Sequence, residues 1–321
     1  MTYPKVSIII LNWNGLKDTI KCLESLKKIT YPNYEVIVVD NGSEGNDADI
    51  LEEQYKDYIR VIRNKENLGF AGGNNVGIRK VLEEGKSEYI LLLNNDTIVD
   101  PSFLDELVKV ATQDEKIGSV QSLLLNLNKK TIDSLGQELL LWGATDKGIY
   151  SDKSLYNLEE NQEIFGACAA SVLYKTEVIK QTGFFDEKFF AIFEDVDLSW
   201  KIRLIGYKSF LAVKSLVYHK RGISGKSSSS NFKKYLFHKN LLSIIFRYYP
   251  QSLILFFIRR YPYKFLRSFS GAIIYSFKIE GINGFLNLFI SFKKDLIVRK
   301  KYKHNQYLKL TQDKWIKKKI S

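Results

Sequence analysis

Short apolar runs alternate with helix-like segments from residue 6 to about residue 126. The runs are rich in β-branched residues, as in VSIIIL, EVIVVD and YILLLNND, and helix-like segments such as DTIKCLESLKK separate them. Continuous apolar strands that alternate with helices are typical of a mostly parallel sheet covered on both faces. The sequence therefore predicts an α/β fold for this part of the chain.

The regular pattern stops between residues 127 and 163, where the sequence is polar and contains Gly and Asn. We expect loops and irregular strands there, over one edge of the sheet. Regularity returns at GACAASVLYK, and the stretch DVDLSWKIRLIG has Leu198, Ile202 and Ile205 at helical spacing. This stretch predicts a helix with Asp195 at its start.

The charge of the chain is unevenly distributed. From Lys220 onward there are 23 Lys and Arg residues against three acidic residues, whereas the preceding residues include 25 basic and 33 acidic ones. Aromatic residues are interleaved with the basic ones, as in FFIRRYPYKFLRSF. This composition favours amphipathic helices on an anionic membrane surface; single-stranded nucleic-acid binding and a helical cap or dimer contact are the alternatives.

The sequence lacks the signatures of several protein classes. No window reaches the 18 apolar residues of a spanning helix, and the early run VSIIIL is too short for a secretion signal. Cys22 and Cys168 are far apart and lack metal-type spacing, which indicates reduced thiols and a cytoplasmic protein. Neither G-x-G-x-x-G nor a P-loop occurs, so NAD and ATP are poor candidates for a ligand.

Two groups of polar and acidic residues are candidates for a catalytic site. They are Asn94, Asn95 and Asp96, which close an apolar run, and Glu194, Asp195 and Asp197 about a hundred residues later. A carboxylate at the end of a strand lies at the edge of the sheet, where open α/β folds bind ligands. Carboxylates from two separate segments are what a metal site and a general base would need. Either group alone is also compatible with solvated loops or a capped helix.

A series of motifs in residues 4–222 points to a known family. In chain order they are VSIIILNWNG, VIVVDNGS, NLGFAGGNN, LLLNNDT, GACAASVLYK, FFDEKFFAIFEDVDLSWKIRLIGY and VYH. In this order they resemble nucleotide-sugar glycosyltransferases of the GT-A fold, family 2, and among them the rhamnosyltransferase-like members. The resemblance implies a Rossmann-like GT-A catalytic domain at residues 1–225. The resemblance says little about the last hundred residues. From their composition we expect a basic, aromatic-rich helical region at 226–321 that serves a membrane surface or oligomerisation, with SGKSSSS (224–230) as a linker or lid.

The resemblance also implies a donor site. Asp40, which ends the second apolar run, would hold the nucleotide base, helped by groups near Asn12, Asn14 and Asn41. The Gly-rich stretch 67–75 opens a helix, so its backbone amides could meet a phosphate or a sugar. The other donor-binding candidates are Gly69, Asn74, Asn95 and Asp96.

A metal site is implied at Asp96 and His219. Asp96 is similar to the last carboxylate of the family's D-x-D-like motif, which binds a divalent metal bridging the donor phosphates, and Asn94 stands where the first Asp often occurs. His219, in VYHKRG, resembles the family's C-terminal metal ligand, although a His at a strand end is by itself more often structural. Oxygen ligands suit Mg²⁺ or Mn²⁺, and an imidazole favours Mn²⁺.

By the same resemblance Asp195 is the catalytic base, while Glu194 and Asp197 orient it or bind the acceptor. Neighbouring carboxylates raise the pKa of such a base by like-charge repulsion. The implied function is an inverting, metal-dependent transfer of a sugar, with L-rhamnose from dTDP-rhamnose as the first choice, onto a lipid-linked or cell-wall polysaccharide acceptor. We expect a cytoplasmic protein, peripheral on the inner face of the cell membrane, that can form a homo-oligomer and binds no nucleic acid. A non-catalytic nucleotide-sugar-binding or membrane-docking subunit is the alternative.

Overall fold

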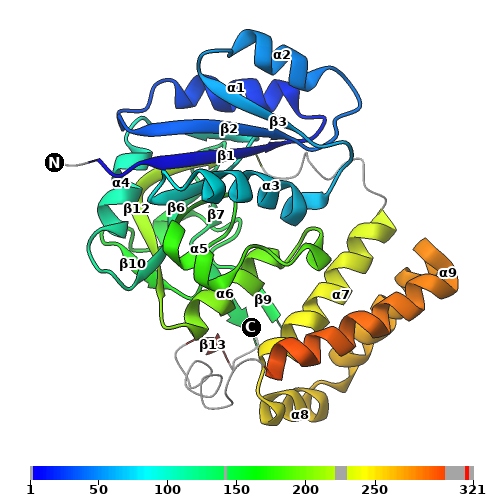
Figure 1. Ribbon diagram of the computed structural model, residues 1–321. Helices are drawn as coiled ribbons and strands as arrows, with labels where there is room; N and C mark the ends of the chain where they lie inside the picture. Colours follow the sequence, from blue (N-terminus) through cyan, green and yellow to red (C-terminus); the bar gives the residue numbers. More distant parts are fainter. Residues whose placement is uncertain (1–2, 141–142, 221–229, 301–314, 318–321) are drawn as a thin grey trace.

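The computed structural model describes residues 3–140, 143–220, 230–300 and 315–317 (Figure 1). In this part of the chain the main sheet has ten strands. They are β1 (Val6–Asn12), β2 (Tyr34–Asp40), β3 (Ile59–Arg63), β4 (Tyr89–Asn94), β5 (Thr97–Val99), β6 (Ile117–Asn126), β7 (Ile132–Ser134), β10 (Gln162–Ile164), β11 (Ser171–Lys175) and β12 (Lys208–His219). The α-helices that precede the C-terminal region are α1 (Leu16–Leu26), α2 (Asp47–Gln54), α3 (Gly69–Glu84), α4 (Phe103–Ala111), α5 (Thr176–Thr182) and α6 (Glu194–Leu204).

The strand order is β10-β12-β6-β11-β4-β1-β2-β3, with β5 and β7 paired to β12 and β6. Strands β4, β1, β2 and β3 are parallel, as are β6 and β12, and β11 runs antiparallel between the two parallel groups. Figure 1 shows α1 and α2 on one face of β1–β3 and α3 on the other. The predicted α/β fold is confirmed.

The central strands are buried on both faces, which explains their uninterrupted apolar sequences. In β1, Ile8 and Ile10 pack in one core with side chains of α1 and α4, whereas Ile9 packs in a second core with Ile78 of α3. Successive side chains of a strand point to opposite faces, so a strand between two helix layers needs apolar residues at every position.

The polar stretch 127–163 forms short elements at the edge of the fold. It contributes β7 and β10 to the main sheet, the short helix η1 (Lys153–Leu155), and a separate small sheet of β8 (Gln137–Leu140) and β9 (Gly143–Asp146) with β13 (Ile316–Lys317). The predicted helix beginning near Asp195 is α6. It follows a second short helix, η2 (Glu187–Phe189).

The C-terminal region is helical, as expected. It contains α7 (Ser230–Tyr248), α8 (Gln251–Arg260) and α9 (Pro262–Lys300), and α9 bends at Gly281, whose φ is +59°. Within the described residues, none of the helices has the length and apolar content required to cross a bilayer. The division predicted between residues 225 and 226 falls outside the described residues, as does the predicted linker or lid apart from Ser230.

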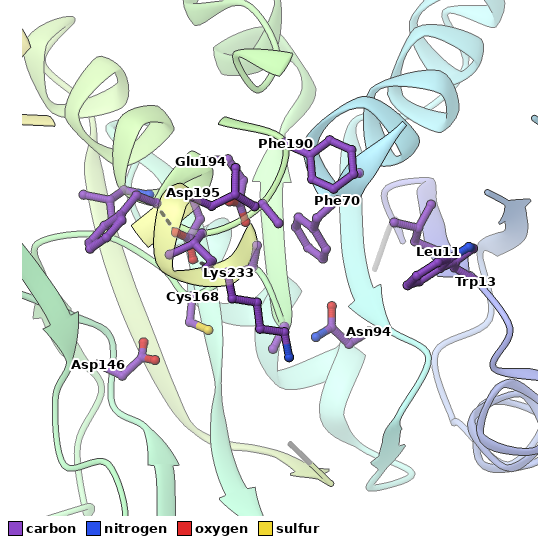
Figure 2. Close-up of a pocket in the computed structure, with 18 of the residues that line it drawn as sticks. Leu11, Trp13, Phe70, Asn94, Asp146, Cys168, Phe190, Glu194, Asp195 and Lys233 are labelled. Carbon is purple, nitrogen blue, oxygen red and sulfur yellow. Dashed lines mark hydrogen bonds between the residues drawn. The ribbon is translucent and has the colours of Figure 1, made fainter. Parts of the chain in front are cut away.

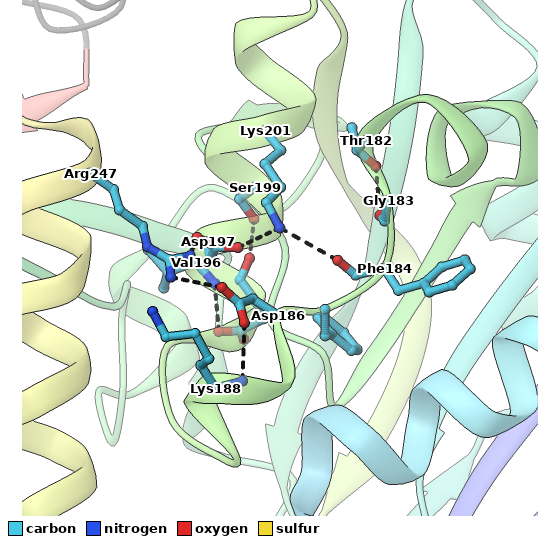
Figure 3. A network of polar contacts seen from close by, with 12 residues as sticks. Thr182, Gly183, Phe184, Asp186, Lys188, Val196, Asp197, Ser199, Lys201 and Arg247 are labelled. Atoms are coloured by element: carbon cyan, nitrogen blue, oxygen red, sulfur yellow. Dashed lines mark hydrogen bonds and ion pairs between the residues drawn. The ribbon is translucent and has the colours of Figure 1, made fainter. Parts of the chain in front are cut away.

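A buried arginine joins these helices to the α/β part (Figure 3). Arg247 of α7 is 1% exposed, and its guanidinium group donates at 2.7 Å to each of three carboxylates, those of Asp186, Asp197 and Asp295. Asp186 precedes η2, Asp197 is on α6, and Asp295 is on α9. Lys201 also pairs with Asp197, at 2.7 Å. The helices α6, α7 and α9 therefore share one ion-pair network.

Replacing Arg247 by Met should lower the free energy of unfolding by about 3–5 kcal/mol, because removing the shared partner leaves the buried carboxylates of Asp197 and Asp295 with one lysine each. Guanidinium-induced unfolding followed by circular dichroism measures this change. The control is Arg267→Met on α9, where the side chain is exposed and the expected change is about 0.5 kcal/mol or less. Equal stability of the two variants would contradict a structural role for the network.

Candidate functional site

A cavity of about 630 Å³ opens at the carboxyl ends of β1, β4 and β12 (Figure 2). This is the edge at which open α/β sheets bind ligands, and the volume suits a small organic ligand. Leu11, Asn94 and His219 line it from the strand ends, and α7 contributes the opposite wall with Phe232 and Lys233. Helix α7 of the C-terminal region therefore forms part of the site.

On the side of β2, two of the predicted donor residues reach the cavity and others support them from behind. Asn41 and Gly69 line the cavity. Asp40 is buried and accepts hydrogen bonds from Asn12 Nδ2 at 2.9 Å and Ser43 Oγ at 2.6 Å. Asp40 and Asn12 form a hydrogen-bonded pair that does not line the cavity, although the neighbouring residues Asn41 and Leu11 do.

The other predicted donor residues are placed as follows. Asn14 has a left-handed backbone, with φ +50°, and its side chain accepts from the Glu44 amide at 2.8 Å. Asn74 is buried in α3, where it donates to the Phe70 carbonyl at 2.9 Å, and it does not line the cavity. Asn95 does line it and donates to Thr19 Oγ1 at 2.9 Å.

Gly69 permits a close contact between the two halves of the site. Its φ is +74°, and a Cβ atom there would lie 2.5 Å from the carbonyl oxygen of Phe190. The same carbonyl accepts a hydrogen bond from the Ala71 amide at 3.0 Å. The start of α3 is thus in direct contact with the loop that precedes Asp195. Only glycine fits this position without displacement.

His219 is held between two carboxylates. Its Nδ1 atom lies 2.8 Å from Asp133 Oδ2, and its Nε2 atom lies 3.0 Å from Asp96 Oδ1. Burial would lower the pKa of His219, but the hydrogen bonds to Asp133 and Asp96 raise it to about 9. Sequence reasoning missed Asp133, which lies in the polar stretch after β6 and has no motif around it.

With the proton on His219 Nε2 displaced, the Asp96 and His219 side chains would fit a partly open divalent-metal site. One carboxylate oxygen and one imidazole nitrogen meet there, and both atom types bind Mn²⁺. No group of three or more His, Cys, Asp or Glu residues within the described ranges could enclose an ion, so donor phosphates and water would have to complete the shell. Asp133, on the far nitrogen of His219, matches the carboxylate that commonly orients a metal-binding histidine.

Asp195 lies at the start of α6 and lines the cavity. Its carboxylate accepts hydrogen bonds from the Ala169 amide at 3.2 Å and from the Val196 amide at 2.8 Å. Burial and the nearby charge of Asp146 raise the pKa of Asp195 to about 6. A carboxylate with this pKa is ionised at neutral pH and is a stronger base than an ordinary aspartate.

Two more acidic residues line the same wall. Burial and the charge of Asp195 raise the pKa of Glu194 well above its usual value. Its Oε2 atom has no hydrogen-bond partner among the described residues. Asp146 of β9 accepts from Ser134 Oγ at 3.1 Å. Sequence reasoning missed Asp146, since only the fold brings β9 beside α6.

Asp197 does not line the cavity. It is fully buried, with one oxygen paired to Lys201 and the other to Arg247 and the Tyr248 hydroxyl at 2.7 and 2.6 Å. Burial would raise the pKa of Asp197, but the charges of Lys201 and Arg247 hold it below its usual value. Its predicted role in acceptor binding does not fit this position, so Asp197 has no place in the acceptor site proposed below.

The loop before Asp195 has an unusual backbone that α7 supports. Phe190, Ile192 and Phe193 all have positive φ, at 61°, 72° and 73°, which is rare for residues other than glycine and costs free energy. Asn240 of α7 is 1% exposed, and its side-chain amide donates to the carbonyls of residues 189, 191 and 192 at 2.7–2.9 Å. The C-terminal region thus fixes the shape of this loop.

Comparisons with known proteins agree with this architecture. The model of the family described as Glycosyl transferase family 2 matches residues 7–183. Poly-beta-1,6-N-acetyl-D-glucosamine synthase of Staphylococcus epidermidis is 26% identical over 208 residues, which cover 63% of this chain and 47% of the relative. O-antigen biosynthesis protein RfbC of Myxococcus xanthus is 27% identical over 236 residues, covering 70% of this chain and 18% of the relative. The chain spans about half the length, or less, of these relatives.

Solved structures share the fold. GalNAc-T7, crystallised with UDP, GalNAc and Mn²⁺, has a TM-score of 0.64 at 16% identity, covering 81% of this chain and 51% of that one. The mannosyltransferase PcManGT from Pyrobaculum calidifontis, in complex with GDP-Man and Mn²⁺, has a TM-score of 0.55 at 13% identity, covering 98% and 89%. At these identities the likeness concerns the fold. The family match covers more than half of the sequence, and the chain therefore belongs to glycosyl transferase family 2.

Proposed function

We propose that the chain is an inverting, metal-dependent glycosyltransferase that moves a sugar from a nucleoside diphosphate to a glycan acceptor. The observation that carries this proposal is the meeting of two kinds of group at one cavity. At the strand ends, His219 lines the cavity and its Nε2 atom lies 3.0 Å from Asp96, which is buried and does not itself line the cavity; the two are a pair suited to a metal. At the start of α6, the carboxylate of Asp195 has a pKa of about 6. Family membership supports the same reaction class.

In the proposed reaction, Asp195 accepts the proton of an acceptor hydroxyl while that oxygen attacks the anomeric carbon. The bond from this carbon to the diphosphate breaks as the new bond forms, and the diphosphate leaves with the electron pair. Glu194 lies beside Asp195 in the cavity lining, and its Oε2 atom, which has no partner among the described residues, is available for a hydrogen bond with the acceptor. A divalent ion held by Asp96 and His219 would neutralise charge on the diphosphate.

The donor and acceptor are proposed from weaker support. L-rhamnose from dTDP-rhamnose remains our first choice because of the motif order in residues 4–222. Solved neighbours have other nucleotides, namely UDP and GDP-Man, so a donor panel should include all three bases. The relatives named for poly-N-acetylglucosamine synthesis and O-antigen biosynthesis support a polysaccharide acceptor, which we propose to be lipid-linked or part of the cell wall.

The exposed surface of α9 supports a position on the inner face of an anionic membrane. In the part of α9 after Gly281, apolar side chains recur on one face of the helix, and each is about half exposed or more. They are Ile282, Leu286, Phe289, Ile290, Leu296 and Ile297. Exposed Lys293 and Lys294 lie among them, and exposed Arg267 and Lys278 lie in the part of α9 before Gly281. Apolar side chains with a basic border are the pattern of helices that lie in a bilayer interface.

Replacing Asp195 by Asn should abolish sugar transfer while nucleotide binding persists, since the amide cannot accept the proton. For the unmodified protein, kcat/KM should rise with pH through about 6 and level off above it, because the deprotonated carboxylate is the active form. Chromatographic detection of the released product across pH 5–8 measures the transfer rate of the variant and the pH profile of the unmodified protein. Turnover by Asp195→Asn near the wild-type rate would refute the base and favour a non-catalytic, nucleotide-binding protein.

Replacing Asp133 by Asn should weaken Mn²⁺ binding by about tenfold or more, because the neutral amide no longer orients and polarises His219 as a carboxylate does. Calorimetric titration with Mn²⁺ in the presence of the nucleotide measures the affinity. Asp96→Ala should make nucleotide binding indifferent to EDTA, whereas EDTA weakens it in the wild type. Indifference to EDTA in both proteins would refute the metal site.

The variant Phe289→Ser/Ile290→Ser should reduce binding to phosphatidylglycerol vesicles about tenfold or more, because burying one apolar side chain of this size in the bilayer contributes about 1.5–3 kcal/mol. Vesicle sedimentation measures binding. Leu155→Ser is the control, as this side chain is also exposed but lies on η1. Binding to single-stranded oligonucleotides in place of vesicles, or a dimer dissolved by the double substitution, would contradict the membrane proposal.

A further inference from the structure

Helix α7 brings a lysine into the cavity. Lys233 lines it together with Phe232 and Leu236, within the first two turns of α7. Figure 2 shows the lysine side chain extending into the cavity toward the side on which Asn94 lies. Asn94 in turn contacts the metal-site histidine, with its Nδ2 atom 3.3 Å from His219 Nε2.

The start of α7 is held firmly enough to direct this side chain. The Phe232 ring packs edge-on against Phe190, with 5.4 Å between ring centroids. Leu236 is buried, and Asn240, one turn further along, holds the loop carbonyls described above. The backbone from which Lys233 extends is therefore fixed relative to the loop that precedes Asp195.

The neighbouring lysines each contact a protein group, whereas Lys233 has no ion-pair partner among the described residues. Lys220 pairs with Asp18 at 3.0 Å, and Lys239 donates to the Lys188 carbonyl at 2.6 Å. The ammonium of Lys234 lies over the Tyr275 ring, 5.6 Å from its centroid. Lys233 has no ion pair with any residue that the structure describes, and it is the one Lys or Arg among the described residues that line the cavity.

A cation that points into a cavity without a protein partner is suited to an anionic ligand. In a nucleotide-sugar transferase the anion is a diphosphate, which gains negative charge as the sugar departs, and a positioned cation stabilises that charge. We propose that Lys233 binds the distal phosphate of the nucleoside diphosphate, on the side of the cavity where Asn94 and His219 lie. This inference rests on the proposed function. It makes α7 a source of a residue that touches the donor.

The test compares Lys233→Met with its neighbour Lys234→Met, which removes the same charge from a side chain directed at α9. Affinities for a nucleoside diphosphate and the matching monophosphate are measured by calorimetry with Mn²⁺. The pairs are UDP and UMP, dTDP and dTMP, and GDP and GMP. Lys233→Met should weaken diphosphate binding by about tenfold or more, the usual effect of losing one charged hydrogen bond, and leave monophosphate binding within about twofold. Lys234→Met should change neither, and Lys233→Arg should retain most of the affinity.

The possible failures are distinguishable. If the wild type binds none of these nucleotides, the proposed function fails and this inference fails with it. If the wild type binds a diphosphate and Lys233→Met binds it equally well, the assignment of Lys233 alone is overturned, even if the KM for a diphosphate-linked lipid acceptor rises. Equal weakening of diphosphate and monophosphate would likewise overturn a contact with the distal phosphate.

Discussion

The buried guanidinium group of Arg247 sets the arrangement on which the rest of the molecule depends. Three carboxylates from separate segments accept hydrogen bonds from it. Water could replace the guanidinium group at these carboxylates only if the interface between α6, α7 and α9 opened. Buried charges are costly unless each is paired, so this geometry is strongly selective for one packing of the helices. Because α6 begins with Glu194 and Asp195, the same packing fixes where the proposed base stands.

Helix α7 is the element through which these constraints reach the cavity. Its last turn holds Arg247, its middle holds Asn240 against the loop before Asp195, and its first turns carry Lys233. The loop itself contacts Gly69 at the start of α3, on the opposite side of the site. A displacement of α7 would therefore alter both the proposed donor side and the proposed acceptor side of the cavity. The C-terminal region and the α/β sheet operate as one structural unit.

Local sequence patterns predicted the sheet and several residues that line the cavity. They did not predict the contacts between distant segments. The apolar runs indicated β1, β2 and β4, because strands buried on both faces are apolar throughout. Asp133, Asp146, Asn240 and Arg247 have no such pattern around them, and only tertiary packing gives them partners. The predicted role of Asp197 in acceptor binding does not fit for a geometric reason, because residues two apart on a helix point about 200° from each other. When Asp195 faces the cavity, Asp197 faces away from it, toward Arg247.

The interface between α6 and α7 also contains a fluorescent side chain, Trp200. The indole ring of Trp200 is fully buried and stacks on Tyr248, with 5.2 Å between centroids and 4° between planes. Trp13, in contrast, lines the cavity. Indole emission shifts to longer wavelength when water reaches the ring, and it is quenched when an aromatic base stacks on it. Separation of the two helices and occupation of the nucleotide side would thus give different spectral signatures in the same unlabelled protein.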